Sequence, residues 1–136
     1  MEWMLMPLKR YADFSGRSRR KEYWMFILGY VIALGALTAI GGVLGAFSGG
    51  ADGPGVVGLF FIGLIVIFVL GLFIPSLAVQ VRRFHDQDKS GWFVLLGLVP
   101  YVGGLIVLVF MCLEGTNGPN RFGDDPKGVG NADVFE

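Results

Sequence analysis

The sequence is poor in charge, and its few charged residues are missing from three long stretches. Asp, Glu, Lys and Arg make up 16% of the 136 residues, where about 25% is typical of soluble domains. None of them occurs within Tyr23–Phe47, Val56–Val81 or Trp92–Leu113. Each stretch reaches the roughly 20 apolar residues that cross a hydrocarbon core about 30 Å thick. A soluble helical bundle would carry a polar stripe on each helix, so the absence of such stripes predicts a membrane protein.

Residues that build metal and redox sites are almost missing. The chain has one cysteine, Cys112, and one histidine, His85. An internal disulfide is therefore excluded, and no CxxC, HxxxH or HExxH spacing exists. The Asn and Asp residues near the carboxyl end do not match the spacing of a calcium loop, and no phosphate-binding glycine loop occurs. We expect no metal and no cofactor. The net charge of zero gives no overall field that favours nucleic acid.

The sequence does contain long apolar stretches, and 54% of its residues are hydrophobic. Residues 23–47 and 56–81 are predicted to be transmembrane helices, and residues 92–113 to be a third. The sequence therefore predicts a single all-α membrane domain with about three transmembrane helices.

The third apolar segment contains a break, Pro100-Tyr101-Val102-Gly103-Gly104. Proline and glycine are tolerated within membrane helices, so we favour a kinked helix that crosses the bilayer. The alternative is a re-entrant hairpin, each arm of which is about half the length needed to span.

Charged residues gather in three polar segments outside the apolar stretches. The amino tail, residues 1–22, holds six Lys and Arg among aromatic and aliphatic residues, which is typical of a segment in the lipid headgroup region. The connector, residues 82–91, holds three Lys and Arg. The positive-inside rule therefore places the amino end and this connector in the cytoplasm. The carboxyl tail, residues 114–136, lies outside after three crossings and inside if the third segment is re-entrant.

Small residues on the first long helix suggest close helix packing. Gly29, Ala33, Gly41 and Gly45 recur at helical spacing, and such residues let helix backbones approach each other. Packing within the chain is the simpler interpretation, and a second copy of the chain or another membrane protein is the alternative partner.

The connector offers the best candidates for chemistry. Arg82 and Arg83 could bind phosphate in a bidentate manner, and His85 beside Asp86 could act as an acid–base pair. Adjacent helical residues do not face one another, however, so we favour a structural role. A further expectation concerns the tail: if Asp124 or Asp125 pairs with Arg82 or Arg83, the third segment must be re-entrant.

Three motifs in this order resemble a known bacterial family. They are Phe14-Ser15-Gly16-Arg17-Ser18-Arg19-Arg20-Lys21-Glu22-Tyr23-Trp24, then Arg82-Arg83-Phe84-His85-Asp86 with Ser90-Gly91-Trp92, and then Gly115-Thr116-Asn117-Gly118-Pro119-Asn120-Arg121-Phe122-Gly123-Asp124-Asp125-Pro126. Together they resemble the YhaH-like inner-membrane proteins, the family called domain of unknown function 805. The resemblance implies a bacterial inner-membrane location but no reaction, substrate or cofactor.

The family's recurring polar positions supply most of the candidate functional residues. The resemblance and the charge pattern together single out Arg17, Arg19, Glu22, Trp24, Arg82, Arg83, His85, Asp86, Ser90, Trp92, Asn120, Arg121 and Asp125. We favour a non-enzymatic membrane module whose basic motifs contact anionic lipid headgroups or a partner protein. The alternative is a membrane-embedded enzyme or transporter component that acts on a lipid-linked or phosphorylated molecule.

Overall fold

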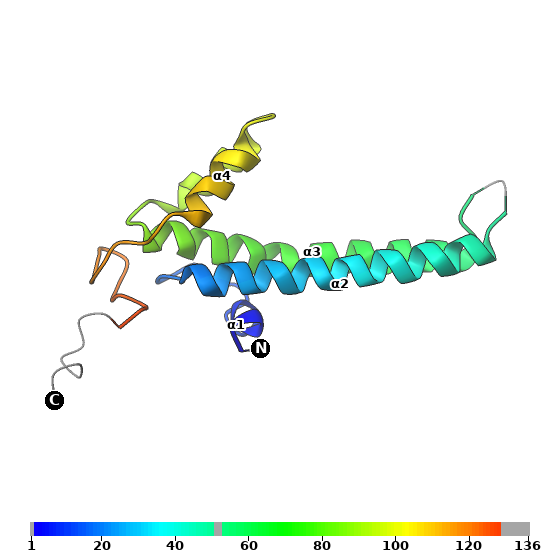
Figure 1. Ribbon diagram of the computed structural model, residues 1–136, viewed down its shortest axis with the longest axis horizontal. Helices are drawn as coiled ribbons and strands as arrows, with labels where there is room; N and C mark the ends of the chain where they lie inside the picture. The colour runs from blue at the N-terminus through cyan, green and yellow to red at the C-terminus, as the bar shows by residue number, and fades with distance from the viewer. Residues whose placement is uncertain (1, 51–52, 129–136) are drawn as a thin grey trace. The chain divides into compact units, whose positions relative to one another are not determined.

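The computed structural model describes residues 2–50 and 53–128, and the helices in these ranges are those named in Figure 1. In chain order they are α1 (Glu2–Lys9), α2 (Arg20–Ser48), α3 (Val56–Asp86), the 3₁₀ helix η1 (Gly91–Leu98) and α4 (Gly103–Cys112). Among the described residues the only β-type pairs are isolated bridges, Gly50 with Gly53 and Asn120 with Gly123. The first turn and the carboxyl tail were predicted to be irregular; residues 51–52 and 129–136 of them, like Met1, lie outside the described ranges.

The chain divides into two compact units. One, here called the hairpin unit, is Ile27–Ile74; the other, the polar unit, combines the described parts of 1–26 and 75–136. Helices α2 and α3 contribute to both.

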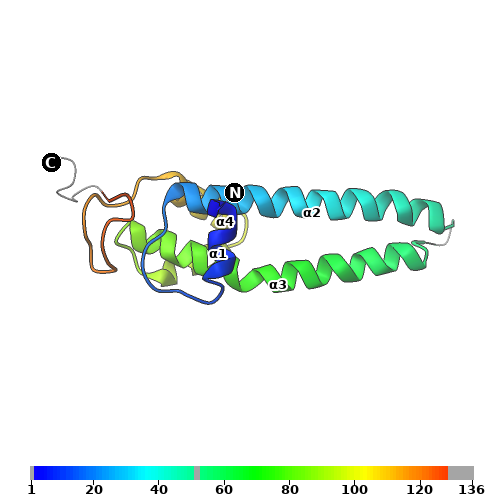
Figure 2. The same ribbon diagram turned by 90° about the horizontal axis from the view of Figure 1, so that it is seen from below.

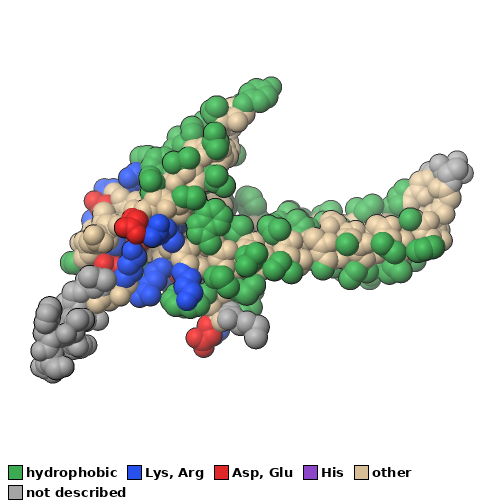
Figure 3. Space-filling model, viewed as in Figure 1, with side chains coloured by type: hydrophobic (Ala, Val, Ile, Leu, Met, Phe, Trp, Pro, Cys, Tyr) green, Lys and Arg blue, Asp and Glu red, His purple; other side chains and the backbone are tan. Residues whose placement is uncertain are grey.

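The hairpin unit consists of the apolar parts of α2 and α3, which run side by side in opposite directions (Figures 1 and 2). With 29 and 31 residues, α2 and α3 are both long enough to cross a bilayer at about 1.5 Å per residue. Only 6% of the most apolar window of each helix is buried, and side chains such as Ile32, Phe60 and Ile67 are more than half exposed. Figure 3 shows hydrophobic side chains all along this unit. A soluble core helix would bury these side chains, so their exposure fits lipid as the surrounding medium.

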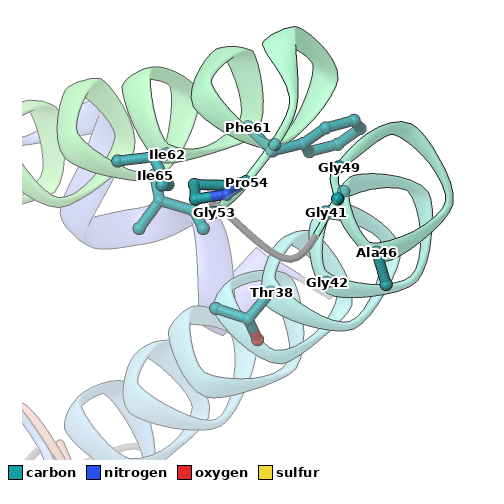
Figure 4. A pocket seen from close by; sticks show the side chains of 13 residues that line it. Thr38, Gly41, Gly42, Ala46, Gly49, Gly53, Pro54, Phe61, Ile62 and Ile65 are labelled. Carbon is teal, nitrogen blue, oxygen red and sulfur yellow. The ribbon is translucent and has the colours of Figure 1, made fainter.

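Glycine sets the close approach of the two helices in the hairpin unit. A Cβ atom added at Gly45 would lie 3.1 Å from the Cα atom of Gly58, and one added at Gly41 would lie 2.6 Å from the Cβ atom of Phe61. Tyr30 and Phe68 stack with their ring centroids 5.6 Å apart. A pocket of about 420 Å³ lies between the two helices near their connecting turn, lined by Gly41, Gly45, Gly58 and their neighbours (Figure 4). The prediction that Gly41 and Gly45 serve helix packing within this chain is confirmed.

In the polar unit, the third apolar segment is broken where the sequence predicted. The 3₁₀ helix η1 ends at Leu98, α4 begins at Gly103, and the two helices pack against each other. A Cβ atom at Gly103 would lie 2.3 Å from the carbonyl oxygen of Leu96, so the reversal requires glycine there. Tyr101, at the turn, has φ +67° and is fully exposed.

Both ends of this segment return to the same place. The ring of Phe84 at the end of α3 lies 5.9 Å from Phe93 and 5.7 Å from Phe110, measured between centroids. The arms contain 8 and 10 residues, which is about half a bilayer core. The third segment is therefore a hairpin, which was the alternative in the sequence analysis. It is not the single kinked helix that the sequence analysis favoured. The all-α fold, with two long apolar helices and a third, broken apolar segment, is confirmed.

Candidate functional site

Asp86, the last residue of α3, is the centre of a buried charge cluster. Its Oδ1 atom accepts hydrogen bonds from Nε of Arg17 at 3.0 Å and lies 2.9 Å from Nη2 of Arg17. Its Oδ2 atom lies 2.5 Å from Nη1 of Arg83. The carboxylate and both guanidinium groups are at most 4% exposed. The charge-assisted contact with Arg17 thus joins the first sequence motif to the second, and the contact with Arg83 lies within the second.

Arg17 also binds the carboxyl tail. Its Nη2 atom donates to the carbonyl oxygen of Thr116, and its Nη1 atom donates to that of Gly118, both at 2.6 Å. Thr116 in turn donates its backbone N–H to the carbonyl oxygen of Asp86 at 2.7 Å. The tail approaches so closely that a Cβ atom at Gly115 would lie 2.0 Å from Oδ2 of Asp86. The five-donor fork of arginine suits this role, because it can bind a carboxylate and several carbonyls at once.

A second buried ion pair lies beside the first. Nη2 of Arg82 is 3.2 Å from Oε1 of Glu22, and the side chains are 0% and 4% exposed. The backbone N–H of Ser18 donates to the carbonyl oxygen of Arg82 at 3.1 Å, and Arg83 donates to the carbonyl oxygen of Leu113. The buried charge cluster, which we define as Arg17, Glu22, Arg82, Arg83 and Asp86, therefore ties the amino tail, the end of α3 and the carboxyl tail together.

His85 does not pair with Asp86. Its Nδ1 atom lies 3.1 Å from the carbonyl oxygen of Gly16, and its ring stacks on Phe122 with centroids 3.9 Å apart and planes 4° from parallel. Since Asp86 faces the two arginines, the acid–base pair considered from sequence is not assembled. A groove of about 540 Å³ lies next to His85. Its lining is mainly apolar and includes Trp92 together with the polar Ser90.

The tail residues singled out from sequence hold the third motif in place. The side-chain amide of Asn120 donates to the carbonyl oxygen of His85 at 2.9 Å and to Oγ1 of Thr116 at 2.8 Å. The carboxylate of Asp125 accepts the backbone N–H groups of Gly118 and Lys127, both at 2.9 Å. The hydrogen bond from the backbone N–H of Lys127, and to a smaller extent that from Gly118, lower the pKa of Asp125.

The anticipated pairing of Asp124 or Asp125 with Arg82 or Arg83 does not occur, because Glu22 and Asp86 take those arginines. The tail nevertheless reaches the connector through Arg17 and Thr116.

The remaining candidates lie at the edge of the polar unit. Arg19 donates to the carbonyl oxygen of Pro126 and lies 5.6 Å from the ring centroid of Trp3. Trp24 and Trp92 are exposed, and Ser90 caps η1 by accepting the N–H of Trp92. Arg121 pairs with Asp88 at 3.2 Å on the surface.

Sequence reasoning missed Gly115 and Thr116 as site residues, although both stand in the third motif. Their signal was the Gly-Thr pair one residue after the end of the apolar segment, because glycine permits close backbone approach and threonine supplies a hydroxyl. Within residues 2–50 and 53–128, no group of three or more His, Cys, Asp or Glu side chains is arranged to hold a metal ion.

Comparison with known proteins finds relatives over most of the chain. The sequence model of a family described as "Protein of unknown function (DUF805)" matches residues 11–124. Inner membrane protein YhaH of Escherichia coli is 46% identical, and inner membrane protein YhaI of the same organism is 45% identical. The YhaH match covers 93% of this chain and 98% of the relative, and the YhaI match covers 93% and 97%. The uncharacterised protein YiiR of Escherichia coli is 23% identical over 86% of this chain and 88% of the relative. No solved structure matches the chain.

Proposed function

The chain belongs to the DUF805 family, and from this premise we propose that it is a non-enzymatic module of the bacterial inner membrane whose basic amino-terminal segment binds anionic lipid. The observation that carries the proposal is the surface of that segment. Leu5 and Leu8 of α1 are 51% and 37% exposed, the exposed Lys9 follows Leu8, and the exposed Lys21 lies with its Nζ atom 5.3 Å from the ring centroid of Trp3 on α1. Apolar side chains flanked by cations are the signature of a segment that lies in the headgroup region.

The basic motifs divide into two groups with different roles. Arg17, Arg82 and Arg83 are buried and engaged with carboxylates and carbonyls, so they hold the polar unit together. The cations left for lipid are those at the surface of the amino segment, Lys9 and Lys21 with the half-exposed Arg20. Each such cation contributes about 1 kcal/mol of attraction to an anionic bilayer surface.

The same geometry supports a topology. The amino tail, the end of α3 and the carboxyl tail share one buried cluster, so they belong on one side of the membrane. The Lys and Arg excess of residues 1–22 and 82–91 makes that side the cytoplasm.

The alternative, an enzyme or transporter component working through His85 and Asp86, has less support. Asp86 is held by two arginines, and His85 is held by Gly16 and Phe122. A general base has to reach its proton freely, and these two side chains are committed to structural contacts.

The proposal is tested by measuring how deeply α1 sits in the bilayer. In a Cys112→Ser background, Leu5→Cys and, as a control at an exposed position of the carboxyl tail, Asn117→Cys are spin-labelled in nanodiscs. The label at position 5 should be accessible to oxygen and the label at position 117 to a water-soluble nickel reagent. The contrast should grow when phosphatidylglycerol replaces phosphatidylcholine. Equal accessibility of both labels, unchanged by lipid charge, would refute the proposal.

A further inference from the structure

A groove of about 390 Å³ lies between the start of α2 and the end of α4, both in the polar unit. Its lining is Arg20, Lys21, Trp24, Met25 and Cys112. We propose that this groove binds one anionic phospholipid, with the phosphate at Arg20 and Lys21 and an acyl chain along Trp24, Met25 and Cys112. The inference rests on the proposed function and names the lipid-binding site within it.

Helical spacing places the two cations of the groove next to its apolar side chains. Arg20 stands four residues before Trp24, and Lys21 stands four residues before Met25, so each cation shares a helix face with an apolar side chain. Glu22 points elsewhere, because it pairs with the buried Arg82. The groove is therefore cationic at one end and apolar along its length, as a phospholipid is anionic at its head and apolar along its tail. The amino end of α2 adds partial positive charge at the cationic end.

The cations of the groove are available to a ligand. Arg20 donates from Nη2 to Oε1 of Glu114 at 2.6 Å and from Nη1 to the carbonyl oxygen of Cys112 at 3.2 Å, but the Arg20 and Glu114 side chains are 41% and 65% exposed. An exposed ion pair contributes little, so a lipid phosphate can take the place of Glu114. Lys21 is exposed, and its Nζ atom lies 5.3 Å from the ring centroid of Trp3. Figure 3 shows Lys and Arg side chains gathered near the start of α2.

The apolar wall of the groove contains a tryptophan, the residue typical of the boundary between headgroups and acyl chains. Trp24 is 36% exposed and packs edge-on against Tyr23 at 5.4 Å between centroids. Tryptophan prefers the boundary between headgroups and acyl chains. Cys112, on the opposite wall, is exposed and ends the apolar helix α4. These features favour a membrane phospholipid over a free phosphate, which would use the cations and leave the wall uncovered.

The test uses the purified full-length protein in detergent with a phosphatidylglycerol analogue that carries a photoreactive diazirine in one acyl chain. After irradiation, adducts should map to the peptides that contain Trp24, Met25 and Cys112. The doubly substituted Arg20→Gln/Lys21→Gln variant should bind the lipid roughly thirtyfold more weakly, from two lost surface cation contacts. The charge-matched control Arg121→Gln/Lys127→Gln, at exposed positions outside the proposed lipid-binding segment, should retain these adducts. Met25→Trp, which fills the groove and keeps both cations, should lose them.

Three results would overturn the inference. One is equal labelling of the groove by a phosphatidylcholine analogue. Another is unchanged labelling in Arg20→Gln/Lys21→Gln, with each variant's fold checked by circular dichroism. A third outcome, protection of the groove by millimolar inorganic phosphate alone, would assign the cations to free phosphate and also overturn it. Each of these results leaves the depth of Leu5 in the bilayer unaffected, so failure of the groove is distinguishable from failure of the proposed function.

Discussion

At the scale of single residues, the polar unit depends on Asp86, which neutralises two buried guanidinium groups at once. Arg17 and Arg83 are at most 2% exposed on their side chains. A buried charge that loses its partner keeps its full desolvation cost. Removing this carboxylate should therefore lower the free energy of unfolding by more than the net stability that either ion pair contributes.

Asp86→Asn should accordingly destabilise the protein strongly. The amide removes the negative charge shared by Arg17 and Arg83, and we expect a loss of about 3–5 kcal/mol, as when one partner of a buried ion pair is removed. Thermal unfolding in detergent, followed by circular dichroism, measures the change.

Asp88→Asn is the matched control for this substitution. Asp88 pairs with Arg121 at the surface, where the side chains are 45% and 61% exposed. Its loss should cost no more than about 1 kcal/mol. Similar destabilisation by the two substitutions would contradict a structural role for the buried charge cluster.

At the scale of helices, the hairpin unit is held at close range by glycines that face the partner helix. Gly45 lies against Gly58, whereas a Cβ atom at Gly42 would meet nothing within 4 Å. The two glycines are three residues apart in the same helix, so they share the same intrinsic helix propensity and differ in packing.

Gly45→Val should therefore be more disruptive than Gly42→Val. Valine at position 45 has to push the helices apart, and overpacking of this kind costs about 1–3 kcal/mol. The stability of the two variants can be compared by thermal unfolding in the same detergent. A larger loss for Gly42→Val would mean that another surface, such as a second copy of the chain, covers that face.

At the scale of the whole molecule, the path of the third apolar segment decides where the carboxyl tail lies. Phe93 and Phe110, near the two ends of the segment, both contact Phe84, and Arg17 binds the tail beyond it. These contacts are the basis of the proposed topology, in which the amino tail and the carboxyl tail share one aqueous compartment.

Fusions after Glu136 measure this directly. A green fluorescent protein fused there should fluoresce, because the proposed cytoplasmic side lets it fold. Alkaline phosphatase at the same position should be inactive, since it needs the periplasm to form its disulfides. The opposite pattern, with an active phosphatase, would exclude the shared compartment and the re-entrant hairpin.

The candidate residues show how far sequence patterns reach. The motifs located Arg17, Arg82, Arg83, Asp86 and Asn120, and the structure brings all five into one region. The patterns did not reveal that Asp86 binds Arg17 and Arg83 and does not pair with His85. That choice depends on a residue 69 positions away, Arg17, whose distance in space no local pattern records.

The sequence by itself determined the all-helical membrane class, the two long apolar helices and the position of the break in the third segment. Local physics suffices for these features, because hydrophobic length and the Pro-Gly break act within one segment. Only the tertiary structure decided that the third segment turns back. A kinked crossing helix and a hairpin have the same local pattern, and they differ in whether Phe93 and Phe110 meet Phe84 and whether the tail meets Arg17. The three uncharged stretches thus indicate a membrane protein, and contacts of the few buried charges hold the carboxyl tail beside the end of α3.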